Sequence, residues 1–236
     1  LMLQEGAIEI DFGNDFAVLR EWGWEQRHTS GMSTLFASRN LIETTVRRLL
    51  AGLPNVELQT RATVTGLETT PTDSGTKVNA VEYVSSLGTG RTSLSADLVV
   101  DASGRGSKVL DWLKRLGISA PTETIVNAHT GYSSRWFNAP TAEHLPKEWW
   151  WKGLWLDVQL PSHTMAGVLF PVENNRWIVT LAGVSHNYPP SDEDAFTKAL
   201  THVRSPILEQ AVRLAEPISP VYSYRRMENR FRHYEK

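Results

Sequence analysis

One twelve-residue stretch constrains the fold of this chain more than any other. Residues 96–107 run Ala-Asp-Leu-Val-Val-Asp-Ala-Ser-Gly-Arg-Gly-Ser, the pattern of a short buried strand that ends at Asp101, followed by a glycine turn and the start of a helix. In proteins that bind dinucleotides, a carboxylate at the end of such a strand meets a ribose hydroxyl, and the helix N-terminus faces a phosphate. A plain strand–turn–helix connection has the same composition, so this segment alone leaves both interpretations open.

The glycine-rich fingerprint that normally accompanies this geometry is absent from all 236 residues. Gly88-Thr-Gly90 and Gly104-Arg-Gly106 both lack a third glycine at the required offset. The chain therefore lacks the backbone cradle that usually holds a pyrophosphate.

Composition excludes several classes of function. A net charge of −2 gives no general attraction to nucleic acid or to anionic lipid, so we expect neither as a partner. The sequence contains no apolar run near 18 residues, and we expect a cytoplasmic protein without stable membrane insertion. The absence of cysteine excludes disulfides and thiolate nucleophiles, and the seven histidines lack metal-site spacing, so no metal is expected.

The expected elements change in character near residue 121. Before it we predict a helix that begins near Arg39 with Ser38 or Asn40 as its cap. There follow a strand over 56–61, a β-meander over 62–68, 78–84 and 92–94, a buried strand over 98–100, and a helix after Ser107. After residue 121 we predict long strands over 124–137, 153–160, 164–172 and 176–184, helices opening at 191–194 and at 205–206, and a final strand within 218–234. The fold class is therefore mixed α/β.

The order of these elements carries more information than any one of them. Alone, Ser38-Arg39-Asn40-Leu41-Ile42-Glu43 is an ordinary capped helix with a solvated arginine. Followed by a strand, a meander and the Asp-Ala-Ser-Gly turn, it resembles the FAD-dependent monooxygenases of the para-hydroxybenzoate hydroxylase type, above all their bacterial epoxidase- and hydroxylase-like relatives. Residues 170–177 are similar to the hairpin of that family's substrate domain. Residues 215–218 and 230–236 are similar to the stretch before its second flavin motif.

The resemblance implies a role for five residues in cofactor binding. Arg39 would contact the FAD pyrophosphate, and the backbone around Val64 would meet the adenine. Asp101 and Gly104 would belong to the family's Asp-Gly motif on the flavin side, and Arg105 would neutralise phosphate charge.

Two parts of the family pattern are missing, namely the first strand–glycine loop–helix unit and the second flavin motif. We therefore interpret the chain as an internal fragment. Residues 1–121 would form an incomplete FAD-binding, Rossmann-type domain with its β-meander, and residues 122–236 a mixed β-sheet substrate-binding domain. We expect the fragment itself to be inactive and to bind FAD weakly or not at all.

Tryptophan is unusually frequent, and six of the nine tryptophans lie from Trp136 to Trp177. We predict that Trp155, Phe170 and Trp177 line a pocket for a small apolar or aromatic substrate. An ordinary aromatic core explains the same residues equally well.

The resemblance implies an oxidoreductase in which FAD carries the hard chemistry, NAD(P)H is the reductant and O2 the oxidant. That parent enzyme would be a hydroxylase or an epoxidase. No acid–base pair stands out, so no catalytic residue is predicted. Two alternatives stay open: a flavin reductase of the geranylgeranyl type, and a non-enzymatic, tryptophan-rich module that binds a ligand. Trp22-Gly-Trp24 is similar to the Trp-x-Trp of flavin halogenases but lacks the Ile-Pro that completes that motif, which disfavours a halogenase.

Overall fold

The computed structural model describes residues 1–73, 75–88, 90–225 and 227–234. The chain forms two compact units, Leu1–Leu50 with Ile125–Arg230, and Ala51–Thr124 with Phe231–Lys236. One boundary between the units lies between Thr124 and Ile125, close to the boundary predicted at residue 121. The first fifty residues nevertheless group with the second half, because a strand within them joins its sheet. The assignment of FAD or substrate to either part remains a prediction.

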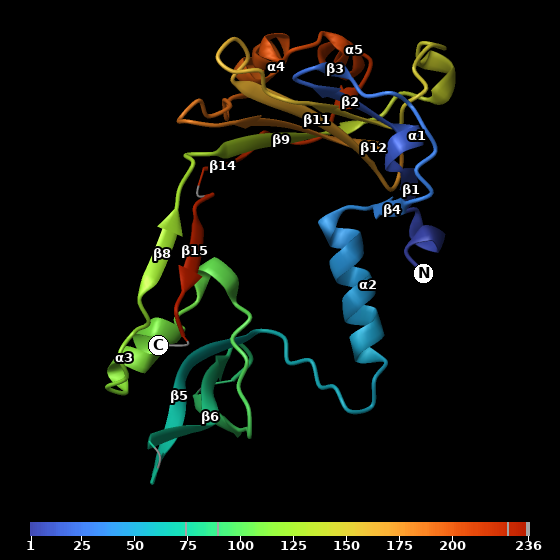
Figure 1. Cartoon of the computed structure of the whole chain (residues 1–236). Coiled ribbons are helices and arrows are strands. Elements are labelled where there is room, and N and C mark those ends of the chain that lie inside the picture. Colours follow the sequence, from blue (N-terminus) through green and yellow to red (C-terminus); the bar gives the residue numbers. More distant parts are fainter. Residues whose placement is uncertain (74, 89, 226, 235–236) are drawn as a thin grey trace. The chain divides into compact units, whose positions relative to one another are not determined.

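The first unit is built on an eight-stranded sheet (Figure 1). Its order is β13 (Glu216–Pro217), β9 (Gly131–Asn138), β12 (Arg176–Gly183), β11 (Met165–Val172), β10 (Gly153–Leu156), β2 (Phe16–Arg20) and β3 (Gly23–Trp24), with β14 (Tyr222–Tyr224) also paired to β9. Neighbours are antiparallel except β10 and β2, which are parallel. The predicted strands over 164–172 and 176–184 are confirmed, and that over 153–160 ends early, at Leu156. The single strand predicted over 124–137 is wrong, because residues 127–130 form no strand and the segment divides into β8 (Glu123–Val126) and β9, which belong to different sheets. Strand β2 was not predicted.

The hairpin between β11 and β12 turns at Asn174 and Asn175, within the segment 170–177 that resembles a family hairpin. Their φ angles are 63° and 51°, a left-handed conformation that asparagine tolerates better than most residues. This turn fixes the register in which Phe170 faces Ile178.

Two helices, α4 (Glu193–Ala199) and α5 (Ile207–Arg213), lie over one face of this sheet (Figure 1). Their residues Phe196 and Leu208 are fully buried against sheet residues such as Leu169 and Leu181. Helix α4 opens within the predicted segment 191–194, where the side chain of Asp192 caps it by accepting a hydrogen bond from the amide of Ala195 (2.9 Å). This helix-covered face holds the main core.

The remaining elements of the first unit flank the sheet. Strands β1 (Ile8–Asp11) and β4 (Ser33–Phe36) form an antiparallel pair, joined to β2 by the single-turn α1 (Phe12–Asp15). Helix α2 (Arg39–Ala51) begins where predicted. Its apolar residues Ile42, Val46 and Leu49 are exposed, and Thr45 is its buried residue. Short 3-10 turns cover Leu3–Glu5, Ala142–His144 and Leu200–His202.

The second unit contains the predicted meander, β5 (Ala62–Thr72), β6 (Gly75–Ser85) and β7 (Arg91–Ser95). The 3-10 turn Gly104–Gly106 leads to α3 (Val109–Arg115), whose first amide donates to the hydroxyl of Ser107 (3.1 Å). Strands β8 (Glu123–Val126) and β15 (Asn229–Arg232) pair with each other, and each begins in one unit and ends in the other. Ser74 and Thr89 in the meander turns, and Glu235 and Lys236 of the terminal motif, lie outside the described residues.

Two strand predictions in this unit are wrong. Residues 56–61 and 98–100 form no strand, and Leu98 and Val100 are 79% and 75% exposed. A strand exists only where neighbouring backbone satisfies its amides and carbonyls. Among the described residues no strand pairs with either segment. The apolar run at 98–100 therefore has the composition of a buried strand but no sheet to join.

Candidate functional site

The face of the large sheet opposite α4 and α5 carries a surface rich in aromatic residues. Side chains alternate along a strand, so Ile178 points away from the core that holds Trp177 and Val179. The register places Ile178 beside Trp136 and Phe170, and Val168 beside Trp155. We call this set the aromatic face: Trp136, Trp155, Val168, Phe170 and Ile178.

Phe170 extends this surface into a cluster of four phenylalanine rings. Its ring stacks on that of Phe36 with centroids 4.9 Å apart, and it lies 5.8 Å from Phe16. Phe12 in turn stacks on Phe16 at 4.6 Å. Aromatic pairs at these separations add to the stabilisation from buried area, so the cluster fixes β4 against this face.

A chain of polar contacts holds the indole of Trp155. Its Nε1 donates to Asp157 (2.5 Å), and Asp157 accepts from Arg20 (3.0 Å). Arg20 also donates to Glu25 (2.7 Å), and these two carboxylates raise the pKa of Arg20 above its ordinary value. These contacts therefore hold the indole ring of Trp155 in one orientation within the aromatic face.

The aromatic face and its flanks also offer polar groups. The hydroxyls of Ser134 and Thr180 lie 2.7 Å apart. Thr180 is paired with Val168 across the sheet, so both hydroxyls lie on the same face as Trp155. The guanidinium of Arg176 lies 5.4 Å from the ring centre of Trp136. Such a surface suits a flat apolar molecule that carries one or two polar substituents.

The three predicted substrate residues do not share one surface. Trp155 and Phe170 lie on the aromatic face, partly buried. Trp177 pairs with Phe137 across β12 and β9 and is 6% exposed in the helix-covered core. The period of two along a strand explains the difference, since Trp177 and Phe170 lie on opposite faces of the sheet.

The start of α2 is tied to the β11–β12 hairpin through Glu173. This carboxylate is 6% exposed and accepts from the amide of Ser38 (2.9 Å) and from its hydroxyl (2.5 Å). The same hydroxyl caps α2 by accepting from the amide of Leu41 (3.1 Å). Arg176 lies 3.3 Å from Glu173 and balances its charge.

Burial raises the pKa of Glu173, but the hydrogen bonds from Ser38 and the charge of Arg176 outweigh it and hold the pKa below its ordinary value. Sequence reasoning placed Glu173 in a family-like hairpin and gave it no role. The only available signal was an acidic residue next to an asparagine turn, which is common on surfaces.

Arg39, the first residue of α2, points into solvent. Its side chain is 88% exposed and pairs with Glu43 on the same helix (2.9 Å). The exposed guanidinium therefore lies at the positive end of a helix dipole, next to the anchored Ser38.

The other predicted cofactor residues belong to the second unit. Asp101 accepts from the amide (3.0 Å) and hydroxyl (2.5 Å) of Ser103 and from the hydroxyl of Ser107. These bonds hold its pKa below the ordinary value, those from Ser103 first. Gly104 has a φ of 70°, and Arg105 follows it on the same exposed turn. Val64 is exposed on β5 beside a bulge.

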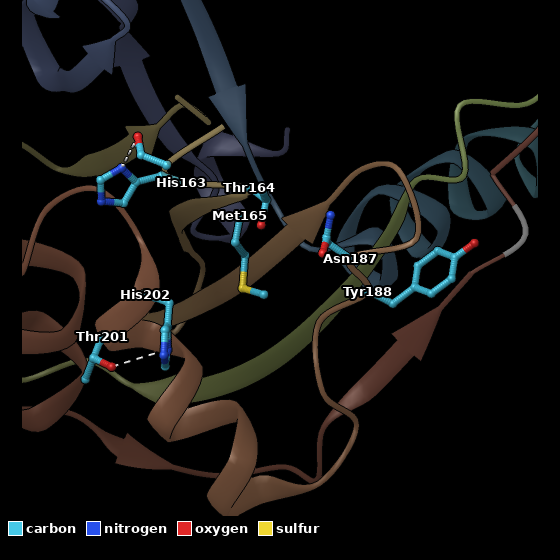
Figure 2. Close-up of a pocket in the computed structure, with 8 residues that line it drawn as sticks. His163, Thr164, Met165, Asn187, Tyr188, Thr201 and His202 are labelled. Carbon is cyan, nitrogen blue, oxygen red and sulfur yellow. Dashed lines mark hydrogen bonds between the residues drawn. The ribbon is translucent and has the colours of Figure 1, made fainter. Parts of the chain in front are cut away.

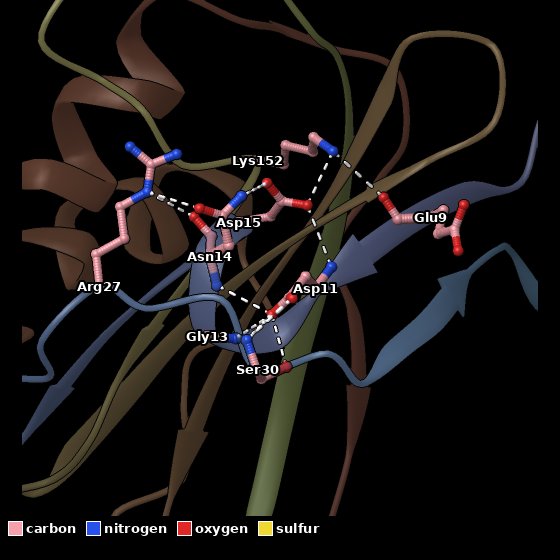
Figure 3. Close-up of polar contacts among 8 residues, drawn as sticks. All are labelled: Glu9, Asp11, Gly13, Asn14, Asp15, Arg27, Ser30 and Lys152. Carbon is pink, nitrogen blue, oxygen red and sulfur yellow. Dashed lines mark hydrogen bonds and ion pairs between the residues drawn. The ribbon is translucent and has the colours of Figure 1, made fainter.

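A network around Asp11 organises the first fifty residues (Figure 3). Its carboxylate accepts from the amides of Gly13, Asn14, Ser30 and Gly31 and from the hydroxyl of Ser30. The Ser30 hydroxyl contributes most, and together these donors lower the pKa of Asp11 to about 2. Asp15 pairs with Lys152 (3.0 Å) in the same network, which ties α1 to the start of β10.

A polar hollow of about 460 Å³ contains His163, His202 and Tyr188 (Figure 2). Each imidazole contacts the hydroxyl of its neighbour in sequence, Ser162 at 3.1 Å and Thr201 at 3.4 Å. Neither imidazole has a carboxylate partner in these contacts, so the hollow lacks the geometry of an acid–base pair. In the described part of the chain, no group of three or more His, Asp or Glu side chains could hold a metal ion.

Within the described residues no helix is both long and apolar enough to cross a membrane.

No protein-family model matches the chain. Protein Rv3254 of Mycobacterium tuberculosis is 29% identical over 146 residues, which is 61% of this chain and 29% of Rv3254. Among solved structures, the flavin-dependent brominase Bmp2 superposes with a TM-score of 0.65 at 16% identity, over 94% of this chain and 52% of its own.

Two monooxygenases superpose as well. PqsL, a probable FAD-dependent monooxygenase from Pseudomonas aeruginosa, has a TM-score of 0.64 at 12% identity, over 94% of this chain and 57% of PqsL. The p-nitrophenol 4-monooxygenase PnpA from Pseudomonas putida has a TM-score of 0.63 at 15% identity, over 97% of this chain and 53% of PnpA. The fold is that of the flavin-dependent monooxygenases and halogenases. The chain spans about half the length of these structures, and the predicted resemblance is confirmed at the level of the fold.

The residues present fit a FAD group only in part. The monooxygenase fold offers an exposed arginine at the start of α2 and a glycine turn at Gly104. The sequence, however, contains no glycine-rich cradle for a pyrophosphate. This chain alone therefore does not build a complete FAD site.

Proposed function

We propose that this chain is a large internal part of a flavin-dependent monooxygenase, a hydroxylase or epoxidase that acts on a small apolar or aromatic substrate. The observation that carries the proposal is the aromatic face, which lies on the large sheet of a flavin-monooxygenase fold. A buried carboxylate holds the start of α2 against the end of the same sheet, so Arg39 stands at a fixed place.

The aromatic face would bind the substrate ring. Trp155 and Phe170 would contact it and exclude water, while Ser134, Thr180 or Arg176 would orient its polar substituents. Trp177 is left out, since it belongs to the core. PqsL, which shares the fold, is known in complex with 2-aminobenzoylacetate, a compound of this kind.

FAD would supply the redox chemistry, with NAD(P)H as reductant and O2 as oxidant. Of this chain's residues, Arg39 would neutralise the pyrophosphate and the backbone near Val64 would meet the adenine. The turn of Asp101, Gly104 and Arg105 would lie on the flavin side. Segments that flank this chain in its gene would provide the glycine cradle.

The first test is a flavin titration of the chain as it stands, followed by absorbance. We expect no stoichiometric yellow complex, because the cradle is missing. Such a complex would contradict this division of the FAD site. With the flanking segments joined, FAD should bind, and Arg39→Ala should weaken it while Arg47→Ala, an exposed arginine on the same helix, should not.

The second test is substrate-dependent O2 uptake by the joined protein, with p-nitrophenol as the first aromatic probe. Trp155→Phe should raise KM up to about tenfold through lost apolar contact and a lost indole anchor. Trp22→Phe, on the exposed turn before β3, is the matched control and should leave KM unchanged. NAD(P)H-dependent saturation of a prenyl double bond without O2 uptake would establish the reductase alternative. Failure of the joined protein to bind any flavin would favour a non-enzymatic module.

A further inference from the structure

A second aromatic hollow lies on the side of the sheet that α4 and α5 cover. It encloses about 450 Å³, and the residues that line it include Trp24, Arg27, Trp149, Trp150, Trp151 and Ile207. Trp149 and Trp151 pack with the helix-covered core, whereas Trp155 and Phe170 belong to the opposite face. We call this hollow the tryptophan pocket, and it is separate from the aromatic face.

Indole rings supply most of the apolar surface of the tryptophan pocket. Trp151 is 8% exposed, and its ring stacks on that of Trp149 with centroids 4.9 Å apart. Trp150 and Trp24 are 37% and 49% exposed. Large rings that stay exposed around a hollow offer a flat apolar surface to the ring of a ligand.

Arg27 is held in one orientation at this pocket. Its Nε donates to the carbonyl of Asn14 (2.9 Å) and to the side-chain oxygen of Asn14 (3.2 Å), as Figure 3 shows. Its guanidinium lies 4.6 Å from the ring centre of Trp150, close enough for a cation–π contact. The guanidinium is therefore positioned before any ligand arrives, which lowers the entropic cost of binding.

The other end of the Arg27 guanidinium is free to bind a ligand. Figure 3 shows its two terminal nitrogens directed away from Asn14. Within the described residues only Nε donates a hydrogen bond, and no carboxylate lies within ion-pair distance of Arg27. The side chain is exposed and lies against Trp150, so a molecule that contacts this ring can also reach the terminal nitrogens. Their N–H groups match the two oxygens of a carboxylate.

Two carboxylates also line the tryptophan pocket, Glu25 and Glu148. Glu25 is paired with Arg20 at 2.7 Å, so its charge is already balanced. Glu148 is exposed and makes no ion pair with a described residue, so water screens its charge. Arg27 is the charged group that fixed contacts hold ready for a ligand, and its charge selects an anion.

We propose that the tryptophan pocket binds a flat aromatic carboxylate. The ring of the ligand lies among the tryptophans, and its carboxylate accepts hydrogen bonds from the terminal nitrogens of Arg27. The volume suits one or two fused rings. This site uses no flavin and no residue of the aromatic face, so it stands independently of the proposed function.

The test uses the whole chain and three probes that share one ring system and differ in charge. They are naphthalene-2-carboxylate, the neutral naphthalene-2-carboxamide and the cationic 2-naphthylmethylammonium, and isothermal titration calorimetry measures the affinity for each. We expect the carboxylate to bind about tenfold tighter than the carboxamide, the ratio for one added charge-assisted hydrogen bond, and the ammonium to bind most weakly. The ratio should shrink as salt is added, because salt screens exposed charges.

Arg27→Gln should reduce the affinity for the carboxylate to that for the carboxamide and leave the carboxamide unchanged. Arg47→Gln, which removes an exposed arginine from α2, is the matched control and should change neither. Trp24→Phe should weaken the carboxylate and the carboxamide alike, because it removes apolar contact and leaves the charge in place.

Three results with the native chain would overturn the proposal, whether or not the variants fold. They are equal affinity for the carboxylate and the carboxamide, tighter binding of the ammonium than of the carboxylate, and no binding of any probe. A folded Arg27→Gln variant that keeps the native preference for the carboxylate would overturn it as well, since the anion would then be bound elsewhere.

Discussion

The start of α2 and the turn at Asp101 contain the same groups in different surroundings. In both, a carboxylate accepts from a serine amide and a serine hydroxyl, close to a helix start and an exposed arginine. At α2 the carboxylate is Glu173, 135 residues away in sequence, and it is buried. At the turn, the donors Ser103 and Ser107 lie two and six residues from Asp101, and all three stay exposed or near the surface.

This difference decides what each carboxylate can stabilise. A contact between distant residues joins two elements and is lost only when they separate. A contact within six residues shapes its own turn and can persist when the rest of the chain unfolds. Glu173 should therefore contribute to the folding of the first unit, and Asp101 mainly to the shape of a loop.

The largest effect is expected for Glu173→Ala. The substitution leaves the amide of Ser38 buried without an acceptor and removes the carboxylate that pairs with Arg176. It should lower the free energy of unfolding by about 2–3 kcal/mol, the cost of buried hydrogen bonds to a charged group. Urea denaturation followed by tryptophan fluorescence would measure it. A loss below about 0.5 kcal/mol, the level of an ordinary surface substitution, would remove the contrast with Asp101.

The second prediction concerns acid. The pKa of Glu173 is lower in the folded protein than in the unfolded chain, where it is about 4.3. Its stabilisation is therefore complete above pH 4.3 and is lost as the pH falls through the folded value. The stability difference between the native chain and Glu173→Gln should shrink in that window. Urea midpoints measured from pH 7 down to pH 3 would show it, and a constant difference would contradict the prediction.

The sequence predicted best those elements that find their partners among the described residues. The β11–β12 hairpin, the meander and the start of α2 all follow from local patterns that local contacts satisfy. The segment 98–100 has an equally strong apolar pattern, but a strand needs a neighbour, and no strand in the described part of the chain pairs with it. An apolar pattern therefore predicts a strand reliably only where the neighbouring strand of the sheet is also identified.

The candidate site was predicted in the same uneven way. Trp155 and Phe170 lie on one face, while Trp177 does not, because spacing along one strand does not reveal which face another strand presents. The contact between Glu173 and Ser38 could not be predicted, since no local pattern links residues 135 positions apart. Long-range polar contacts of this kind are decided by tertiary packing.

Asp11 is an intermediate case and should show an intermediate effect. It accepts from Gly13 and Asn14 nearby, and also from Ser30 and Gly31, which lie 19 and 20 residues away. Asp11→Asn should free the Ser30 loop without unfolding the sheet. Hydrogen exchange should then show faster exchange at the amides of Ser30 and Gly31 and unchanged protection at Leu169 and Val179. Loss of protection throughout the sheet would mean that Asp11, like Glu173, contributes to the folding of the whole first unit.

The smallest effect is expected for Asp101→Ala. The carboxylate is exposed, and its donors are Ser103 and Ser107 on the same turn. The free energy of unfolding should change by less than about 0.5 kcal/mol, as for most surface positions. The shape of the turn should nevertheless change, and the amide signals of Ser103 and Gly104 should move in an NMR spectrum while those of β12 stay fixed. If Asp101→Ala destabilised the chain as much as Glu173→Ala, separation along the sequence would not be what distinguishes the two carboxylates. A negligible loss of stability would mean that any later loss of cofactor binding in this variant reflects the turn itself rather than the fold.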